Sequence, residues 1–187
     1  MKKIGYMGIP GSFSELAADE LIRQTNMEDC EAVPMVSAWN ILKALQDGEA
    51  DMGVLGVDNS SVGAVQEFVE AFRDVDYEII DECVLPIHHC LFKKKNVPQS
   101  SLTVVASHPH ALSQTAKTRA VEFPQLKDVE IEDTAIGAQW LSEDRLPDNT
   151  AVICSINAGR MWDLDMIALN IEDVSTNRTT FWLLKLK

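Results

Sequence analysis

The stretch Asp51-Met-Gly-Val-Leu-Gly-Val-Asp-Asn-Ser-Ser-Val-Gly-Ala-Val65 decides the class of fold. Its apolar half, residues 52–57, shows little alternation, which predicts a strand buried on both faces. A polar turn at 58–61 and an amphipathic run follow. This order of strand, small-residue loop and helix is typical of an open α/β sheet, in which ligands bind beyond the carboxyl ends of the strands. The residues are also typical of an ordinary capped helix, with Asn59 or Ser60 as its N-cap.

The same pattern recurs along the chain. Residues 3–7 are predicted to form a first strand, and Ser12 or Ser14 is predicted to cap a helix that runs to about Arg23. Strand-to-helix junctions rich in Ser, Thr, Asn or Gly are expected at 11–14, 59–63, 107–110, 134 and 155–157. In two facing lobes, several of these junctions would aim N–H donors into one cleft, which suits a small carboxylate ligand.

The alternation of strands and helices predicts the domain organisation. Residues 1–75 alternate strand and helix, which implies a parallel sheet with helices on its faces. Residues 74–92 are predicted to be extended and to cross into a second lobe, and the β-forming residues 177–184 are predicted to return to the first. The expected lobes are 1–75 with 172–187, and 76–171. Other expected strands are 30–35, 103–106, 129–131, 151–154 and 167–171, and other expected helices are 37–46, 63–72, 107–121, 134–142 and one from 155.

The composition favours a globular protein that holds its ligand by short-range contacts. Of the 187 residues, 46% are hydrophobic and 24% are charged, which is ordinary for a soluble globular domain. The 16 basic and 29 acidic residues give a net charge of −13, which argues against nucleic acid or an anionic membrane as a partner. An anionic ligand would have to be held by local N–H and hydroxyl donors, because the long-range field repels it.

The N-terminus and the cysteines favour a cytoplasmic location. Two lysines follow Met1, but Gly8 and Pro10 come before any apolar segment, so no signal peptide is expected. No apolar run approaches the length of a transmembrane helix. The cysteines, at positions 30, 83, 90 and 154, form no Cys-x-x-Cys pair, which favours reduced thiols in the cytoplasm.

Structural or capping roles are favoured over catalytic ones for the histidines and for Ser107. His88 and His89 precede Cys90, but adjacent residues on a strand point to opposite faces, so a structural role is favoured over a metal site. The residues 108–110, His-Pro-His, stand at an expected helix start, where a capping role is favoured over a general acid. Ser107 lies in no Gly-x-Ser-x-Gly elbow, and it is expected to be a cap that also donates to a ligand.

Five short motifs follow one another along almost the whole chain. They are Gly8-x-x-Gly11-Ser12-Phe13-Ser14, Asp58-Asn59-Ser60-Ser61-x-Gly63-x-Val65, Leu85-Pro86-Ile87, Ser107-His108-Pro109-x-Ala111-Leu112-x-Gln114 and Asn177-x-Thr179-x-Phe181. No single one is specific, but the five in this order resemble the catalytic domain of the prephenate dehydratase family.

The resemblance implies α/β architecture, with two lobes of the periplasmic-binding-protein type II kind and a ligand cleft between them. It implies conversion of prephenate to phenylpyruvate with loss of water and carbon dioxide in phenylalanine biosynthesis, with no cofactor and no metal. It implies Thr179 as the catalytic residue and a homo-oligomer as the assembly. The expected substrate-binding residues are Gly11, Ser12, Asn59, Ser60, Ser61, Ser107, Gln114, Thr134, Arg178 and Phe181. The ACT regulatory domain common in the family is not expected, because the sequence ends at Lys187.

Two positions depart from the family's pattern. Asp58 stands where the family usually has glutamate, and Thr180 stands where the family's Thr-Arg-Phe motif has arginine. Arg178 lies two positions earlier, on the same face of the expected strand and about 6.6 Å along it. The missing arginine leaves two alternatives open, a non-aromatising prephenate decarboxylase and a non-catalytic small-carboxylate-binding protein. Asn59 and Thr179 favour the dehydratase.

Overall fold

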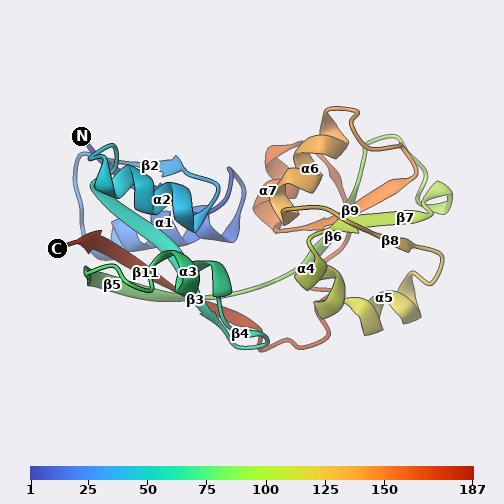
Figure 1. Ribbon diagram of the computed structural model, residues 1–187. Helices are drawn as coiled ribbons and strands as arrows, with labels where there is room; N and C mark the ends of the chain where they lie inside the picture. Colours follow the sequence, from blue (N-terminus) through green and yellow to red (C-terminus); the bar gives the residue numbers. More distant parts are fainter. The chain divides into compact units, whose positions relative to one another are not determined.

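The computed structural model describes residues 1–187, which form two compact units (Figure 1). The first unit is Met1–Ile87 with Thr176–Lys187, and the second is His88–Ser175. The sequence predicts the boundaries after residues 75 and 171. They fall later, because β5 (Tyr77–Pro86) pairs along its length with β11 (Arg178–Leu186) and so belongs to the first unit.

The first unit contains a mixed sheet with the strand order β2-β1-β3-β11-β5, and β4 pairs with β3 off this path. The remaining bounds are β1 Lys2–Tyr6, β2 Cys30–Pro34, β3 Met52–Asn59 and β4 Gly63–Ala64. Strands β1, β2 and β3 are parallel, as the alternation of strands and helices predicts. Strand β11 is antiparallel to both of its neighbours, β3 and β5, so the C-terminal segment forms part of the sheet of the first unit.

Three helices cover the two faces of this sheet (Figure 1). They are α1 (Phe13–Gln24), α2 (Ala38–Gln46) and α3 (Gln66–Ala71). Helix α1 buries Leu21 in one apolar cluster, and α2 buries Ile41 in another cluster that also contains Phe68 of α3. Ser12 and Ser37 cap α1 and α2 as predicted, since each hydroxyl oxygen accepts an N–H from the first turn.

The polar turn after β3 differs from its prediction. The strand continues to Asn59, and β4 then turns back to pair with it, so α3 begins only at Gln66. The glycine of β4 has φ +77°, a conformation that glycine adopts without strain and that lets the chain reverse. Asn59 Oδ1 accepts the N–H of Ser61 at 2.9 Å, which forms an Asx turn. Neither Asn59 nor Ser60 is therefore a helix N-cap.

The second unit contains a five-stranded mixed sheet with the order β10-β6-β9-β7-β8. Its strands are β6 Cys90–Lys93, β7 Val104–Ser107, β8 Lys127–Glu130, β9 Thr150–Cys154 and β10 Asp165–Ala168. Its helices are α4 Pro109–Gln114, α5 Ala116–Glu122, α6 Thr134–Ser142 and α7 Ile156–Met161, with a short 3₁₀ helix at Gln99–Ser101. Helices α6 and α7 cover one face and α4 and α5 the other (Figure 1). None of the helices in the chain has the length and apolar character needed to span a bilayer.

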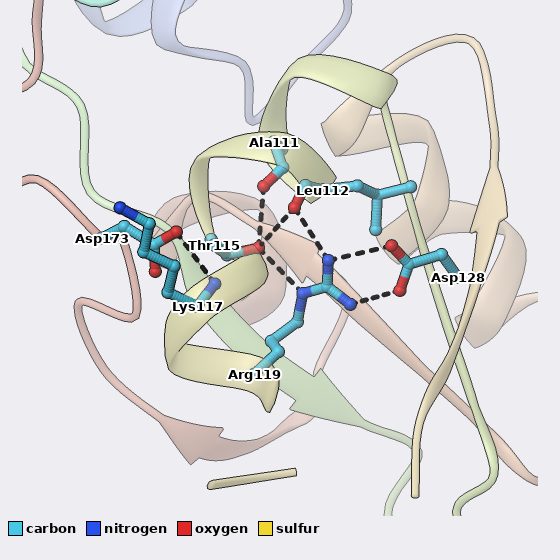
Figure 2. Close-up of polar contacts among 7 residues, drawn as sticks. All are labelled: Ala111, Leu112, Thr115, Lys117, Arg119, Asp128 and Asp173. Atoms are coloured by element: carbon cyan, nitrogen blue, oxygen red, sulfur yellow. Dashed lines mark hydrogen bonds and ion pairs between the residues drawn. The ribbon is translucent and has the colours of Figure 1, made fainter. Parts of the chain in front are cut away.

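The single helix predicted for 107–121 is divided into α4 and α5 at Thr115. The Thr115 hydroxyl donates to the carbonyl of Ala111 at 2.8 Å, and the Arg119 guanidinium donates to the carbonyl of Leu112 at 2.7 Å. Arg119 is almost fully buried and also makes two contacts with the carboxylate of Asp128 (Figure 2). This ion pair, between the buried Arg119 and the half-exposed Asp128, ties the break between the helices to the start of β8.

Candidate functional site

A β-bulge brings Asn59 and Thr179 to the same face of the first sheet. The register of β11 on β3 shifts between Thr180 and Phe181, because Val57 is an extra residue on β3. An extra residue reverses the alternation of side chains along the strand beyond it. Asn59 therefore faces the side of the sheet that carries Thr179.

The amide of Asn59 holds the hydroxyl of Thr179. Its Nδ2 donates to Thr179 Oγ1 at 2.8 Å, to Asn177 Oδ1 at 3.0 Å and to the carbonyl of Arg178 at 3.2 Å. Asn59 and Thr179 are each 8% exposed. Because Thr179 Oγ1 accepts a hydrogen bond from the amide, its own O–H points elsewhere and can be donated.

Ser60 and Ser61 complete this group, which we call the Asn59 cluster (Asn59, Ser60, Ser61, Asn177 and Thr179). Ser60 N–H donates to the carbonyl of Arg178 at 2.9 Å, and Arg178 N–H donates back to Ser60 Oγ at 3.0 Å. Ser61 Oγ donates to Asn177 Oδ1 at 3.1 Å. The side chain of Arg178 is exposed, and strand alternation places it with Thr180 on the face opposite Thr179.

The loop before α1 is already occupied by a carboxylate. Glu15 Oε2 accepts the N–H of Gly11, the residue before the N-cap, at 2.7 Å, and the N-cap Ser12 Oγ accepts the N–H of Glu15 at 3.3 Å. Glu15 also accepts the hydroxyl of Tyr6 at 3.1 Å. Burial and the charge of Glu15 raise the pKa of Tyr6 above its ordinary value. Gly11 and Ser12 thus serve the start of α1, and their role toward a substrate stays a prediction.

In the second unit, Ser107 has a structural partner, and Thr134 lies beside a capped helix start. Ser107 is fully buried, and its hydroxyl donates to the carbonyl of Ile153 at 2.7 Å, which ties β7 to β9. Thr134 begins α6, but the N-cap is Asp133, whose carboxylate accepts two N–H groups of the first turn at 2.7 and 3.0 Å. The helix N-terminus beside Thr134 therefore already holds a negative charge.

Gln114 is held by a buried histidine. Its Oε1 lies 2.8 Å from His89 Nε2, and its main-chain carbonyl accepts the N–H of Asp173 at 2.7 Å. His88 Nδ1 lies 2.7 Å from Glu172 Oε1, so the two histidines have different partners. No group of three or more His, Cys, Asp or Glu side chains is arranged to hold a metal ion. The predicted structural role of the histidines fits these contacts.

Two further residues of β11 and the segment before it, Phe181 and Asn177, lie in the apolar core and in the Asn59 cluster, respectively. Phe181 is 3% exposed and packs with Tyr6 and Leu183 in the apolar cluster under α1, so it supports the site from the core. Asn177 was not among the expected site residues, although its amide oxygen accepts from Asn59 and from Ser61. Its place two residues before Thr179 is the signal that points to it, because such residues share a face of a strand.

Comparisons with known proteins identify the family to which the chain is similar. The family model described as prephenate dehydratase matches residues 4–187. An arogenate dehydratase of Petunia hybrida is 32% identical over 97% of this chain, which spans 42% of that protein. A prephenate dehydratase of Lactococcus lactis subsp. cremoris is 30% identical over 97% of this chain, which spans 63% of that protein.

A solved structure supports the same relationship. A prephenate dehydratase of Arthrobacter aurescens, in complex with L-Phe, superposes with a TM-score of 0.87 at 26% identity, over 99% of this chain and 60% of that one. The expected class of fold, α/β lobes of the periplasmic-binding-protein type II kind, is confirmed. The ligand cleft expected with that fold stays a prediction.

Proposed function

Because the chain belongs to the prephenate dehydratase family, we propose that it converts prephenate to phenylpyruvate with loss of water and carbon dioxide. The contact between Asn59 and Thr179 is the observation that carries this proposal. The reaction needs a hydrogen-bond donor at the departing hydroxyl group, and an amide bond to Thr179 Oγ1 turns the threonine proton outward for that purpose.

The chemistry explains why one well-placed donor is enough. As carbon dioxide leaves, the electron pair of the broken C–C bond enters the ring, and the hydroxyl group leaves with the electron pair of its C–O bond. The ring becomes aromatic, which drives the reaction. Hydroxide is a poor leaving group, so Thr179 hydrogen-bonds to the departing oxygen while a solvent proton, relayed through Thr179 Oγ1, completes the water molecule.

Substrate binding is proposed to rest on local donors. Prephenate carries two carboxylates and the chain carries a net charge of −13, so short-range hydrogen bonds have to hold the anion. Asn59 and Ser60 of the Asn59 cluster are the proposed first contacts. The other residues proposed to bind substrate are Gly11, Ser12, Ser61, Ser107, Gln114, Thr134 and Arg178, with Phe181 as support.

Product analysis tests the reaction. The purified chain is incubated with prephenate, and phenylpyruvate and carbon dioxide are both measured against a reaction without protein and one with Thr179→Ala. A dehydratase forms the two products in equal amounts. Carbon dioxide without phenylpyruvate would indicate the non-aromatising decarboxylase. Binding of prephenate by calorimetry with neither product would indicate a carboxylate-binding protein.

A second substrate has a specific observation in its favour. The petunia relative is named as an arogenate dehydratase, and arogenate carries an amino group where prephenate has its side-chain keto oxygen. The ring chemistry is the same, and the extra positive charge suits an acidic chain. Comparing kcat/KM for the two substrates, with phenylalanine as the product from arogenate, decides which one the chain prefers.

A cytoplasmic location and a homo-oligomeric assembly are also proposed. All four cysteines are free thiols, which suits a cytoplasmic location. The resemblance to the family favours a homo-oligomer. Light scattering coupled to size-exclusion chromatography gives the assembly, and fractionation of the source cells gives the compartment.

A further inference from the structure

His89 is a buried histidine that the proposed chemistry does not use. Only 3% of its surface is exposed, and its Nε2 lies 2.8 Å from Oε1 of Gln114, a residue proposed to bind substrate. We propose that His89 is a positioning residue, which holds the Gln114 carboxamide so that its NH₂ end faces the substrate. This inference rests on the proposed function and names a part of its binding machinery.

In the hydrogen bond between His89 and Gln114, the imidazole is the donor and the amide oxygen is the acceptor. An amide oxygen can only accept, so the proton lies on His89 Nε2. Burial lowers the pKa of His89 below its ordinary value, although Gln114 and Glu172 act in the opposite sense, so the ring is neutral at neutral pH. The oxygen end of the amide faces the imidazole, and the donor end therefore points away from it. A donor end suits an anionic substrate.

The main chain of His89 is fixed independently of Gln114. Its N–H donates to Glu172 Oε2 at 2.9 Å, and its carbonyl accepts the N–H of Ile171 at 2.8 Å. The side chain of Glu172 is 3% exposed, and its other oxygen lies 2.7 Å from His88 Nδ1. Glu172 and His88 are the charged or titratable groups that act on the His89 ring.

The main chain of Gln114 is fixed as well, which leaves its side chain as the mobile part. Gln114 is the last residue of α4, and its carbonyl accepts the N–H of Asp173. The next residue, Thr115, is fully buried and accepts from Arg119 Nε at 3.0 Å (Figure 2). A glutamine side chain has several rotatable bonds, so a buried hydrogen-bond donor that holds one rotamer lowers the entropy lost on binding.

Two substitutions of His89 separate positioning from packing. His89→Leu keeps an apolar side chain but removes the donor, and KM for prephenate should rise roughly tenfold to a hundredfold with kcat little changed. His89→Gln places an amide N–H near the position of Nε2, and it should restore most of the affinity. His88→Asn is the matched control, because that residue contacts Glu172 but not Gln114, and it should behave as the wild type.

A double-mutant cycle tests whether the effect passes through Gln114. In the Gln114→Ala background, His89→Leu should leave KM within about twofold of the single mutant, because no amide remains to be held. An equal rise in KM in both backgrounds would overturn the inference and make His89 a packing residue. A fall in kcat at constant KM in both His89 variants would overturn it as well.

An NMR measurement keeps the inference separate from the proposed function. Long-range ¹H–¹⁵N spectra of the wild-type chain should show His89 as the neutral tautomer protonated on Nε2, and the Gln114 side-chain amide signals should shift in His89→Leu more than in His88→Asn. A tautomer protonated on Nδ1 would refute the inference whether or not the chain is active. If the tautomer is as expected but the chain forms no phenylpyruvate, only the proposed reaction fails.

Discussion

At the scale of single residues, the hydroxyl group of Thr179 is the feature on which the proposed chemistry depends. Thr179→Ala should lower kcat and kcat/KM together by about 10²- to 10⁴-fold, because a transition-state donor is lost. Thr179→Ser should keep much of the activity. Thr180→Ala, on the opposite face of the same strand, is the control. A near-normal kcat in Thr179→Ala would end this assignment.

Arg178 is the second residue with a clear prediction. It lies on the face of β11 that Thr180 occupies, where the family has its arginine. If Arg178 replaces that arginine, Arg178→Ala should raise KM for prephenate, and the double change Arg178→Thr with Thr180→Arg should restore much of the affinity at constant net charge. Steady-state kinetics on these two variants and the wild type tests this role of Arg178. If Arg178→Ala leaves KM for prephenate unchanged, Arg178 is an exposed charge that contributes less than about 1 kcal/mol to substrate binding.

At the scale of elements, Asp173 caps α5 from a distant part of the chain. Its carboxylate accepts the N–H groups of Lys117 and Thr118 at 3.0 and 2.8 Å, and Figure 2 shows it beside Lys117. Desolvation raises its pKa, but these hydrogen bonds outweigh that effect, so the net pKa lies below its ordinary value. A carboxyl group with a lowered folded-state pKa stabilises the fold above its unfolded-state pKa, and this stability is lost as the pH falls through the folded-state value.

Asp173→Asn should therefore lower the free energy of unfolding by about 0.3–1 kcal/mol at neutral pH, because asparagine keeps an acceptor oxygen but loses the negative charge that favours a helix start. The difference from the wild type should begin to shrink below about pH 4, where the carboxyl group of the unfolded chain becomes protonated, and it should be lost as the pH falls through the lower folded-state pKa. Urea denaturation at several pH values measures both effects. Asp165→Asn, a change at a partly exposed carboxylate in β10, is the control. A difference that does not change with pH would contradict the capping role.

The elements also show what the sequence can and cannot predict. Apolar runs and serine caps predicted α1, α2 and the parallel strands, because these depend on residues close together in sequence. The bulge at Val57 and the hairpin after Asn59 were missed. Asn59 and its partner Thr179 are 120 residues apart in the sequence. No local pattern in a single sequence indicates a contact between residues so far apart. The break at Thr115 is not predicted for a related reason, since it depends on the ion pair between the buried Arg119 and Asp128.

At the scale of the whole molecule, acidic residues occupy places where the sequence predicts free donors. Glu15 and Asp133 bind the N–H groups at the starts of α1 and α6. The sequence correctly predicts helix starts near residues 12 and 134, although 59–63 forms a hairpin instead of a helix start. Which of the donors at these helix starts remain for a ligand depends on side-chain contacts. In the first unit, the Asn59 cluster carries the proposed chemistry instead, on a strand end and a turn.

The net charge of −13 leads to a prediction about salt. Prephenate is a dianion, and the field of an acidic chain lowers its concentration near the protein. The Debye length falls from about 30 Å at 0.01 M salt to about 8 Å at physiological ionic strength, which screens this repulsion and leaves direct hydrogen bonds almost unchanged. We therefore expect KM for prephenate to fall as KCl is raised over this range, with kcat unchanged.

Steady-state kinetics at constant pH measures this dependence, and arogenate provides the internal comparison. Because arogenate carries an additional positive charge, its KM should depend less on salt than that of prephenate. A KM for prephenate that rises with salt would mean that a nearby cation outweighs the field of the chain. Arg178 would then be the first candidate, because its side chain is exposed and its main-chain N–H is bonded to Ser60 of the Asn59 cluster, and the rise should disappear in Arg178→Ala. The direction of the salt effect thus separates local donors from a local cation as the means of holding the substrate.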